Sequence, residues 1–183
     1  MIKAIIWDIG GVLIENPKYK EFWQGIKESE RLRILFGERK ISNKEFIKQG
    51  AKLLSLNKKE FLKRYKEAYW TGKRIESTIK IFKKTKVKKY LFSDTNPIHQ
   101  EYLRKIGKDL FKEADKSFLE KRKKYLKSSK EVLKEIRLNP SEVIFIDDKE
   151  EYINVANKLK INAVLFKNTK QLKQDLRKYG VNI

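Results

Sequence analysis

Carboxylate side chains follow three apolar runs of the chain that are typical of buried β-strands. Asp8 follows AIIW, Ser93 and Asp94 follow YLF, and Asp147 and Asp148 follow VIFI. In parallel α/β sheets ligands bind beyond the carboxyl ends of the strands, so we expect these side chains to converge on one crevice. Clustered Asp residues without His or Cys favour a hard cation, and Mg²⁺ is the usual one where phosphate also binds. The pattern therefore predicts a magnesium site beside a phosphate site.

The residues around Asp8 fit phosphoryl transfer. A carboxylate beside a cation can attack phosphorus and form an aspartyl-phosphate. Gly10 and Gly11 allow a tight turn after Asp8 and can present backbone N–H groups to phosphate oxygens. The Ser93 hydroxyl and a lysine would stabilise the charge of the transferring group. For the Asp147–Asp148 pair the alternative is a helix N-cap, but two adjacent acids exceed that need, so we favour metal binding.

The elements that would position these residues alternate between strand and helix. Four continuous apolar runs predict strands buried on both faces, at residues 4–7, 90–92, 143–146 and 163–166. Helical patterns cover residues 97–106, 125–138, 150–159 and 169–179. This rhythm predicts an α/β fold with a doubly wound parallel sheet.

Residues 14–86 break the rhythm, because they contain helical patterns and no convincing strand. Ser42 followed by Glu45, and Asn57 followed by Glu60, are typical of capped helix starts. The aromatic residues behind these starts recur near helical spacing and are expected to form a core. We therefore predict a helical cap domain at 14–86, inserted into a core domain made of residues 1–13 and 87–183.

Composition narrows the classes of protein further. The 183 residues include 45 basic and 24 acidic side chains, a net charge of +21 that attracts phosphates of any kind. Most of the excess is lysine, which is more often a solvated surface than a nucleic-acid site, and no nucleic-acid-binding module is recognisable. Nucleic-acid binding is thus possible but not favoured. The chain has no Cys and no apolar run of about 20 residues, so we expect a cytoplasmic protein without a membrane partner.

Four motifs, in order along the chain, resemble those of the haloacid dehalogenase (HAD) superfamily. They are WDIGGVLIE, LFSDTN, a lysine near the end of FLEKRKK, and VIFIDD. The resemblance covers the whole chain and is closest to HAD-like sugar-phosphate phosphatases with a D-x-G-[GN]-V first motif. It implies a Rossmann-like core with a small helical cap after the first strand, which matches the insert predicted above.

The resemblance also implies roles for individual residues. Asp8 would be the nucleophile and a metal ligand, Ser93 would bind phosphate, and Lys123 is the best match to the lysine of the third motif. The metal, Mg²⁺, would be held by Asp8, the Gly10 carbonyl, Asp147 and Asp148. Resemblance to the same subgroup over residues 94–99 and at the first loop makes further residues candidates for substrate binding: Gly10, Gly11, Asp94, Thr95, Asn96 and His99.

Three departures from the family pattern bear on phosphate chemistry. Most relatives carry a second Asp where this chain has Gly10, and that Asp transfers a proton. Either the leaving group needs little protonation, as in an anomeric or acyl phosphate, or another group such as His99 or Glu15 assists. Asp94 adds a carboxylate that would repel phosphate unless it is paired. The third motif lacks its usual Pro, so the register of its lysine within residues 121–124 stays open.

These observations predict a Mg²⁺-dependent phosphatase acting on a small phosphorylated metabolite through an aspartyl-phosphate on Asp8. The alternative is a catalytically weak HAD-like binding or regulatory protein whose basic surface meets nucleic acid or an acidic partner. Dehalogenase chemistry is disfavoured, because relatives that displace halide carry an aromatic residue and a Thr where this chain has Gly10 and Val12. The sequence names neither the substrate nor the oligomeric state.

Overall fold

The computed structural model describes residues 1–17, 19, 21–120 and 125–183. Within them, five parallel strands form one sheet in the order β3-β2-β1-β4-β5. The strands are β1 (Ala4–Asp8), β2 (Lys88–Asp94), β3 (Lys116–Glu120), β4 (Val143–Asp147) and β5 (Asn162–Leu165). β1 lies in the middle and all its residues are buried, which accounts for its continuous apolar run. The predicted α/β parallel-sheet fold is confirmed.

The strand β3 was not predicted from the sequence. It pairs with β2, Phe118 opposite Phe92, and forms one edge of the sheet. Its sequence, KSFLE, places two apolar residues between polar and charged ones, too short a run to carry a strand signal. The four predicted strands all occur, with bounds that differ by at most two residues.

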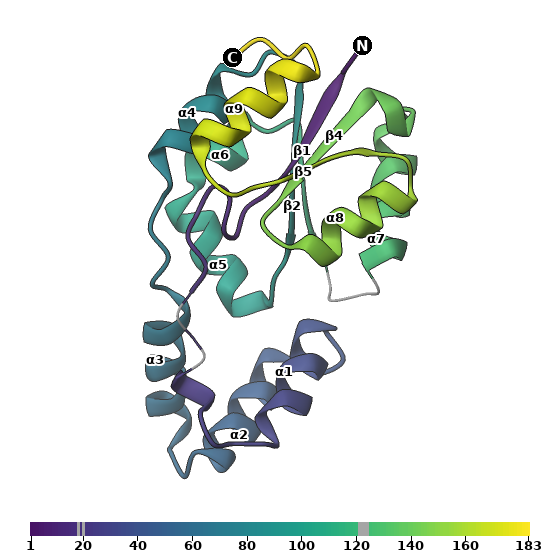
Figure 1. The fold of residues 1–183 in the computed structure, drawn as a ribbon. Coiled ribbons are helices and arrows are strands. Elements are labelled where there is room, and N and C mark those ends of the chain that lie inside the picture. Colours follow the sequence, from purple (N-terminus) through teal and green to yellow (C-terminus); the bar gives the residue numbers. More distant parts are fainter. Residues whose placement is uncertain (18, 20, 121–124) are drawn as a thin grey trace.

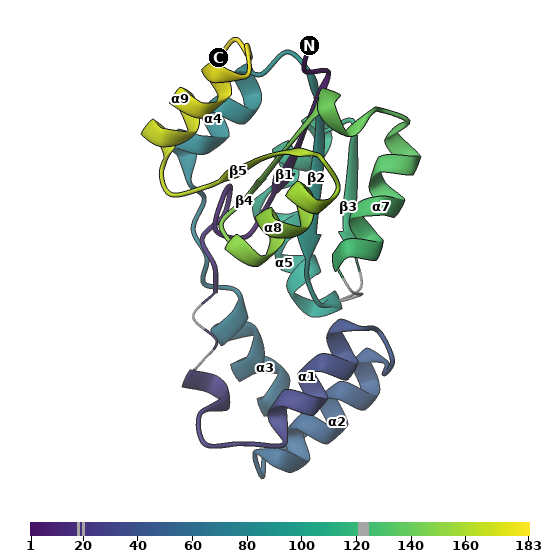
Figure 2. The ribbon, with the colours of Figure 1, turned by 45° about the vertical axis from the view of Figure 1, so that its right-hand side comes forward.

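Helices cover both faces of the sheet (Figures 1 and 2). One face is covered by α4 (Glu76–Lys84), α5 (Pro97–Ile106), α6 (Lys108–Glu113) and α9 (Thr169–Lys178). The other is covered by α7 (Tyr125–Ile136) and α8 (Glu150–Lys158), and the short 3₁₀ helix η2 (Pro140–Glu142) precedes β4. The helices predicted in this part end within two residues of their predicted bounds. Spanning a bilayer would take a longer and more apolar helix than any in the described chain.

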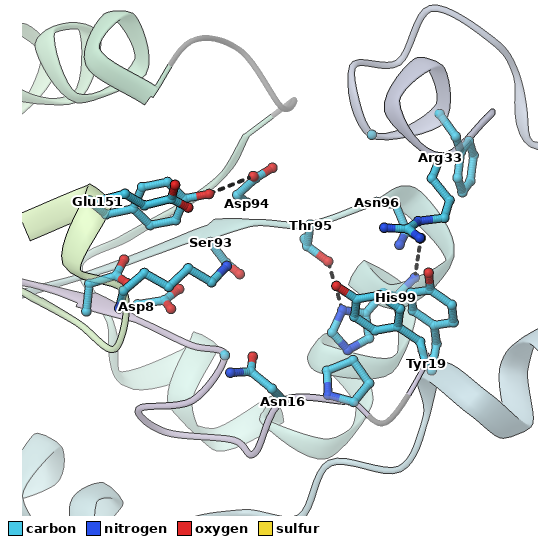
Figure 3. Close-up of a pocket in the computed structure, with 18 of the residues that line it drawn as sticks. Asp8, Asn16, Tyr19, Arg33, Ser93, Asp94, Thr95, Asn96, His99 and Glu151 are labelled. Carbon is cyan, nitrogen blue, oxygen red and sulfur yellow. Dashed lines mark hydrogen bonds between the residues drawn. The ribbon is translucent and has the colours of Figure 1, made fainter. Parts of the chain in front are cut away.

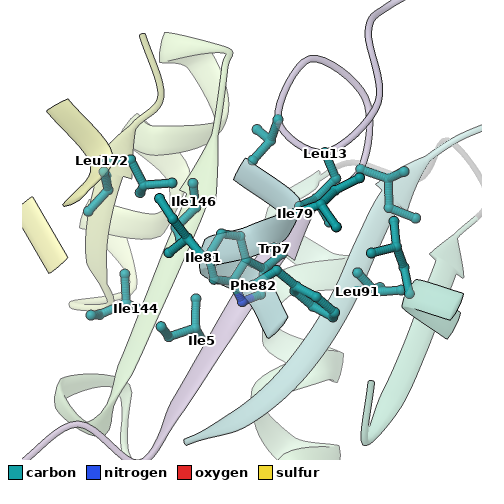
Figure 4. Packing of buried hydrophobic residues seen from close by; sticks show 14 of the residues in the cluster. Ile5, Trp7, Leu13, Ile79, Ile81, Phe82, Leu91, Ile144, Ile146 and Leu172 are labelled. Carbon is teal, nitrogen blue, oxygen red and sulfur yellow. The ribbon is translucent and has the colours of Figure 1, made fainter. Parts of the chain in front are cut away.

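The helix α4 belongs to the packing of the core. Its Phe82 meets Trp7 of β1 edge to face, with ring centroids 5.5 Å apart, and Ile79 and Ile81 join the same buried cluster (Figure 4). Burying a side chain of this size contributes about 1.5–3 kcal/mol. The predicted cap, residues 14–86, includes α4, but the packing places this helix with the core. A helical pattern shows which face is apolar, and not which domain that face contacts.

The cap consists of the 3₁₀ helix η1 (Glu21–Trp23) and the helices α1 (Ser29–Gly37), α2 (Asn43–Leu53) and α3 (Lys58–Tyr69). It lies beyond the carboxyl ends of the strands (Figure 1). Both predicted helix starts are confirmed: the side chain of Ser42 accepts a hydrogen bond from the Glu45 N–H at 3.1 Å, and that of Asn57 accepts from the Glu60 N–H at 2.9 Å. Stacked and edge-on aromatic rings fill the cap interior.

The two chain segments that join cap and core, residues 13–15 and 73–75, run side by side and are called the connector. Ile14 and Arg74 form an antiparallel bridge, the Glu15 N–H donates to the Lys73 carbonyl at 2.8 Å, and the Ile75 N–H donates to the Leu13 carbonyl at 2.9 Å. The Arg74 guanidinium then holds Asp109, at the start of α6, through two hydrogen bonds of 2.6 and 3.0 Å. The chain therefore enters and leaves the cap at one place.

Candidate active site

The carboxyl ends of three neighbouring strands meet below the cap. Asp8 ends β1, Asp94 ends β2 and Asp147 ends β4, and β1 pairs with both of the others. Asp8 and Asp147 are almost fully buried, at 7% and 1% exposure. A cavity of about 660 Å³ opens between these strand ends and the cap. This volume suits a small metabolite.

One carboxylate oxygen from each of Asp8, Asp147 and Asp148 lies within 4.8 Å of the other two. The Asp148 Oδ1 atom is buried and, in the described part of the chain, has no hydrogen-bond partner. A buried carboxylate oxygen without a donor is costly unless a cation meets it. Three oxygen donors at this spacing therefore fit a hard divalent cation.

The Asp8 carboxyl lies in an unfavourable electrostatic environment. Burial raises its pKa well above the usual range, and the charges of Asp147 and Asp148 raise it further. The positive charge of Lys149 partly offsets this, and the Ile9 N–H donates a hydrogen bond to Asp8 Oδ1 at 2.8 Å. A bound cation would remove the repulsion and keep Asp8 ionised, as a nucleophile must be.

The packing around the loop after Asp8 accounts for glycine at both positions 10 and 11. A Cβ atom on Gly10 would lie 2.8 Å from the Asn16 Oδ1 atom, so Asn16 occupies the space beside position 10. Gly11 has a φ of 77°, and a Cβ there would collide with the Asp148 carboxylate. The Asn16 Nδ2 atom donates to Asp148 Oδ2 at 2.8 Å. A side chain at position 11 would therefore collide with Asp148, and one at position 10 would require the Asn16 side chain to shift.

The extra carboxylate of Asp94 has a hydrogen-bond donor. The Tyr152 hydroxyl, from α8, donates to Asp94 Oδ2 at 3.2 Å, the contact drawn as a dashed line at Asp94 in Figure 3. Both residues line the cavity. Burial and the nearby Asp94 charge raise the pKa of Tyr152, so its hydroxyl stays protonated and can donate.

The cap contributes the opposite wall of the cavity. Tyr65 and Tyr69 of α3 stack with ring centroids 4.1 Å apart, and Tyr19 stacks on Tyr69 at 4.9 Å. The Arg33 guanidinium, from α1, lies 5.3 Å from the centre of the Tyr19 ring. All four residues line the cavity. Tyr65 and Tyr69, which were expected to form a core, thus serve both the cap interior and the cavity wall.

The start of α5 lies between the two walls. The Asn96 Oδ1 atom caps this helix, accepting hydrogen bonds from the N–H groups of Ile98 and His99 at 3.1 and 3.0 Å. The His99 Nδ1 atom and the Thr95 hydroxyl are 3.0 Å apart (Figure 3). Burial lowers the pKa of His99 to about 4. The imidazole is therefore neutral near pH 7, so it is suited to hydrogen bonding and poorly suited to donating a proton.

The structure brings most of the predicted site residues to this one cavity. Those on its lining are Asp8, Gly10, Ser93, Asp94, Thr95, Asn96, His99 and Asp147. Gly11 and Asp148 lie directly behind it, against each other. Glu15 lies in the connector instead, where its side chain accepts from the Lys73 N–H at 3.2 Å. Lys123 and its alternatives at 121–124 lie outside the described residues.

Sequence reasoning missed several cavity residues, among them Asn16, Arg33 and Lys149. Lys149 directly follows the Asp147–Asp148 pair, so its place after a strand end could have revealed it. Asn16 contacts Asp148 across 132 positions of sequence, and Arg33 lies on a helix that was not individually predicted. Neither carried a local signal.

Comparison with protein families identifies the class. The family model of haloacid dehalogenase-like hydrolases matches residues 2–156, which include both Asp8 and the Asp147–Asp148 pair. The chain belongs to this family, and it is therefore an enzyme of the hydrolase class. The predicted membership of the HAD superfamily is confirmed.

Solved structures share the fold. A HAD family enzyme from Bacteroides thetaiotaomicron, in complex with magnesium and inorganic phosphate, has a TM-score of 0.74 and 22% identity over 91% of this chain and 95% of that one. A predicted HAD-like family hydrolase from Porphyromonas gingivalis has a TM-score of 0.76 and 18% identity over 98% of each chain. L-2-haloacid dehalogenase from Xanthobacter autotrophicus has a TM-score of 0.63 and 15% identity, over 100% of this chain and 85% of its own. Comparison with curated proteins gave no match.

Proposed function

We propose that the chain is a Mg²⁺-dependent phosphatase that acts on a small phosphorylated metabolite, with Asp8 as nucleophile. The observation that carries the proposal is the cluster of Asp8, Asp147 and Asp148, whose carboxylate oxygens lie within 4.8 Å of one another beside the cavity between core and cap. Three carboxylates repel a phosphate ester unless a cation is present. The magnesium and phosphate bound by the Bacteroides enzyme of the same fold support this reading.

Asp8, Asp147 and Asp148 would hold the metal, with the Gly10 carbonyl as a fourth donor. When bound, Mg²⁺ supplies positive charge that neutralises these carboxylates and the phosphoryl oxygens. Asn16 fixes the Asp148 carboxylate through its 2.8 Å hydrogen bond, and the Lys149 N–H fixes Asp147 Oδ1 at 2.9 Å. Both contacts orient the ligands before the substrate arrives.

The chemistry takes two steps. A carboxylate oxygen of Asp8 forms a bond to phosphorus while the bond from phosphorus to the substrate oxygen breaks, which leaves an aspartyl-phosphate. The Ser93 hydroxyl donates a hydrogen bond to a phosphoryl oxygen, and the Lys149 ammonium contributes positive charge. Water then attacks phosphorus, which releases inorganic phosphate and restores the Asp8 carboxylate.

The leaving oxygen must obtain a proton without the usual second Asp. Asn16, which fills the space beside Gly10, carries no acidic proton, and His99 has a pKa of about 4. We therefore propose that the proton comes from solvent and that anomeric or acyl phosphates are favoured, because their leaving groups are stable as anions.

The test is a panel of sugar phosphates, nucleotides and acyl phosphates, assayed for phosphate release with and without Mg²⁺. We expect turnover that needs the metal and that falls by at least about 1,000-fold in Asp8→Asn. Thermal unfolding with and without Mg²⁺ reports metal binding independently of turnover, and Asp147→Asn should reduce the stabilisation by the metal.

A parallel assay with 2-haloacids separates phosphatase from dehalogenase activity. Halide release that depends on Asp8 and not on Mg²⁺ would contradict the proposal. Absence of any turnover, together with salt-sensitive nucleic-acid binding that Asp8→Asn leaves intact, would favour a binding role for the basic surface.

A further inference from the structure

The guanidinium of Arg33 faces the cavity from the cap. Figure 3 shows Asp8 and Ser93 at one end of the cavity and Arg33 with Tyr19 at the other, with Thr95, Asn96 and His99 between them. Arg33 is partly buried, and its charge lowers the otherwise raised pKa values of Tyr65 and Tyr69, so it lies close to both rings. The position of Arg33 is thus set by an aromatic wall.

No described carboxylate lies within ion-pair distance of Arg33, although other arginines have such partners. Arg64 pairs with Glu60 at 2.7 Å, and Arg74 pairs with Asp109 at 2.6 Å. Glu21 of the cap also lines the cavity, yet it forms no ion pair with Arg33. A guanidinium that is partly buried without a counter-charge loses hydration and gains little in return. Such an arrangement suits a ligand that brings the counter-charge with it.

We infer that Arg33 binds a second anionic group of the substrate, a carboxylate or a phosphate at the end remote from the phosphoryl group that is transferred. This inference rests on the proposed phosphatase function and narrows its substrate class to small metabolites with two anionic ends. The side chains between the two ends, Thr95, Asn96 and neutral His99, suit the hydroxyl groups of a linking carbon chain. The cavity volume of about 660 Å³ accommodates a molecule of that size.

Three substrates with the same anomeric phosphate test the inference. Glucose 1-phosphate has a neutral remote end, glucuronate 1-phosphate has a carboxylate there, and glucose 1,6-bisphosphate has a phosphate. We expect kcat/KM to be at least about tenfold higher for one or both charged compounds, since a hydrogen-bonded ion pair of this kind contributes a factor of about 10–100. The compound with the higher value identifies the kind of anion.

Arg33→Gln should bring the ratio of charged to neutral substrate close to one, and Arg33→Lys should give an intermediate ratio. The matched control is Arg31→Gln, which removes the same charge from an exposed position on the same helix that does not line the cavity. It should keep the wild-type ratio. A wild-type ratio near one for both charged compounds, or a ratio that Arg33→Gln leaves unchanged, would overturn the inference.

The proposed function can fail separately, through absence of Asp8-dependent phosphate release from all three compounds. In that case calorimetric binding of glucuronate 1-phosphate and glucose 1-phosphate to Asp8→Asn protein, with and without Arg33→Gln, still decides the inference. Tighter binding of the carboxylate compound that is lost with Arg33 supports it, and equal binding of both compounds contradicts it. Thermal unfolding of each variant shows that the protein remains folded.

Discussion

The two walls of the cavity differ in charge and in construction. The core wall holds three carboxylates within 4.8 Å, and the cap wall holds Arg33 against stacked tyrosines. Hydrogen-bonded strand ends fix the core wall, whereas packing of aromatic rings fixes the cap wall. Under the proposed function this difference would separate two tasks: the sheet would hold the reacting groups, and the cap helices would present groups that recognise the rest of the substrate.

In the core wall, we expect the largest loss of stability from a substitution at Gly11. Gly11→Ala combines a positive φ with a collision against Asp148, so we expect it to lower the free energy of unfolding by about 2–4 kcal/mol. Phosphate release should fall with it. Urea denaturation at pH 7.5 measures the loss.

Gly25, in the cap, provides the matched control. It has nearly the same φ, 78°, and a Cβ there would meet no atom within 4 Å. Gly25→Ala should therefore cost only the backbone strain, about 1–2 kcal/mol, and should leave turnover unchanged. Equal losses in the two variants would show that Asp148 is not packed against the loop as described.

His99, beside the cap wall, should make stability depend on pH. Its pKa is about 4 in the folded protein and about 6.5 in the unfolded chain, so the unfolded chain binds the proton first as the pH falls. Stability from this residue is complete above about pH 7 and is lost progressively down to pH 4, with a loss of about 2 kcal/mol between pH 7.5 and pH 5. Urea unfolding at both pH values measures it.

His99→Gln should lose less stability over the same interval, because Gln does not titrate. The groups that face His99 are the rings of Tyr69 and Tyr102 and the Thr95 hydroxyl, none of which titrates between pH 5 and 7.5. An identical pH dependence in wild type and variant would mean that His99 is solvated and not buried among these groups.

The smallest expected effect concerns the packing behind the core wall. Gly10 does not have a positive φ, so its Cβ would meet only the Asn16 side chain. We expect Gly10→Ala to cost about 1 kcal/mol in the wild type and to be neutral or slightly stabilising in an Asn16→Ala background. A double-mutant cycle of unfolding free energies measures this coupling. Additive effects would place Asn16 away from position 10.

The sequence predicted the centre of the sheet and one of its edges, β5, but not the other edge, β3. β1 and β4 are buried on both faces, and their continuous apolar runs identified them. β3, at the sheet edge, has too few apolar residues to be recognised. The helix α4 was assigned to the cap because an apolar helix face does not indicate which domain it packs against.

The candidate site likewise has residues that could be predicted from the sequence and residues that could not. Asp8, Ser93 and Asp147 could be predicted because each follows a recognisable strand and parallel strands end together. The contact of Asn16 with Asp148 and the place of Arg33 opposite Asp8 depend on how the cap connector and the cap pack in three dimensions. Spacing along the chain does not encode such contacts.

The pairing of the connector at Ile14 and Arg74 bears on how the cap can change in evolution. Because the segments that begin and end the cap are hydrogen-bonded neighbours, the cap is attached to the core at one place. Segments with adjacent ends can be exchanged, lengthened or shortened without disturbing the host domain. Substrate preference could therefore diversify by replacement of one contiguous stretch of the gene, while the reacting carboxylates stay in place.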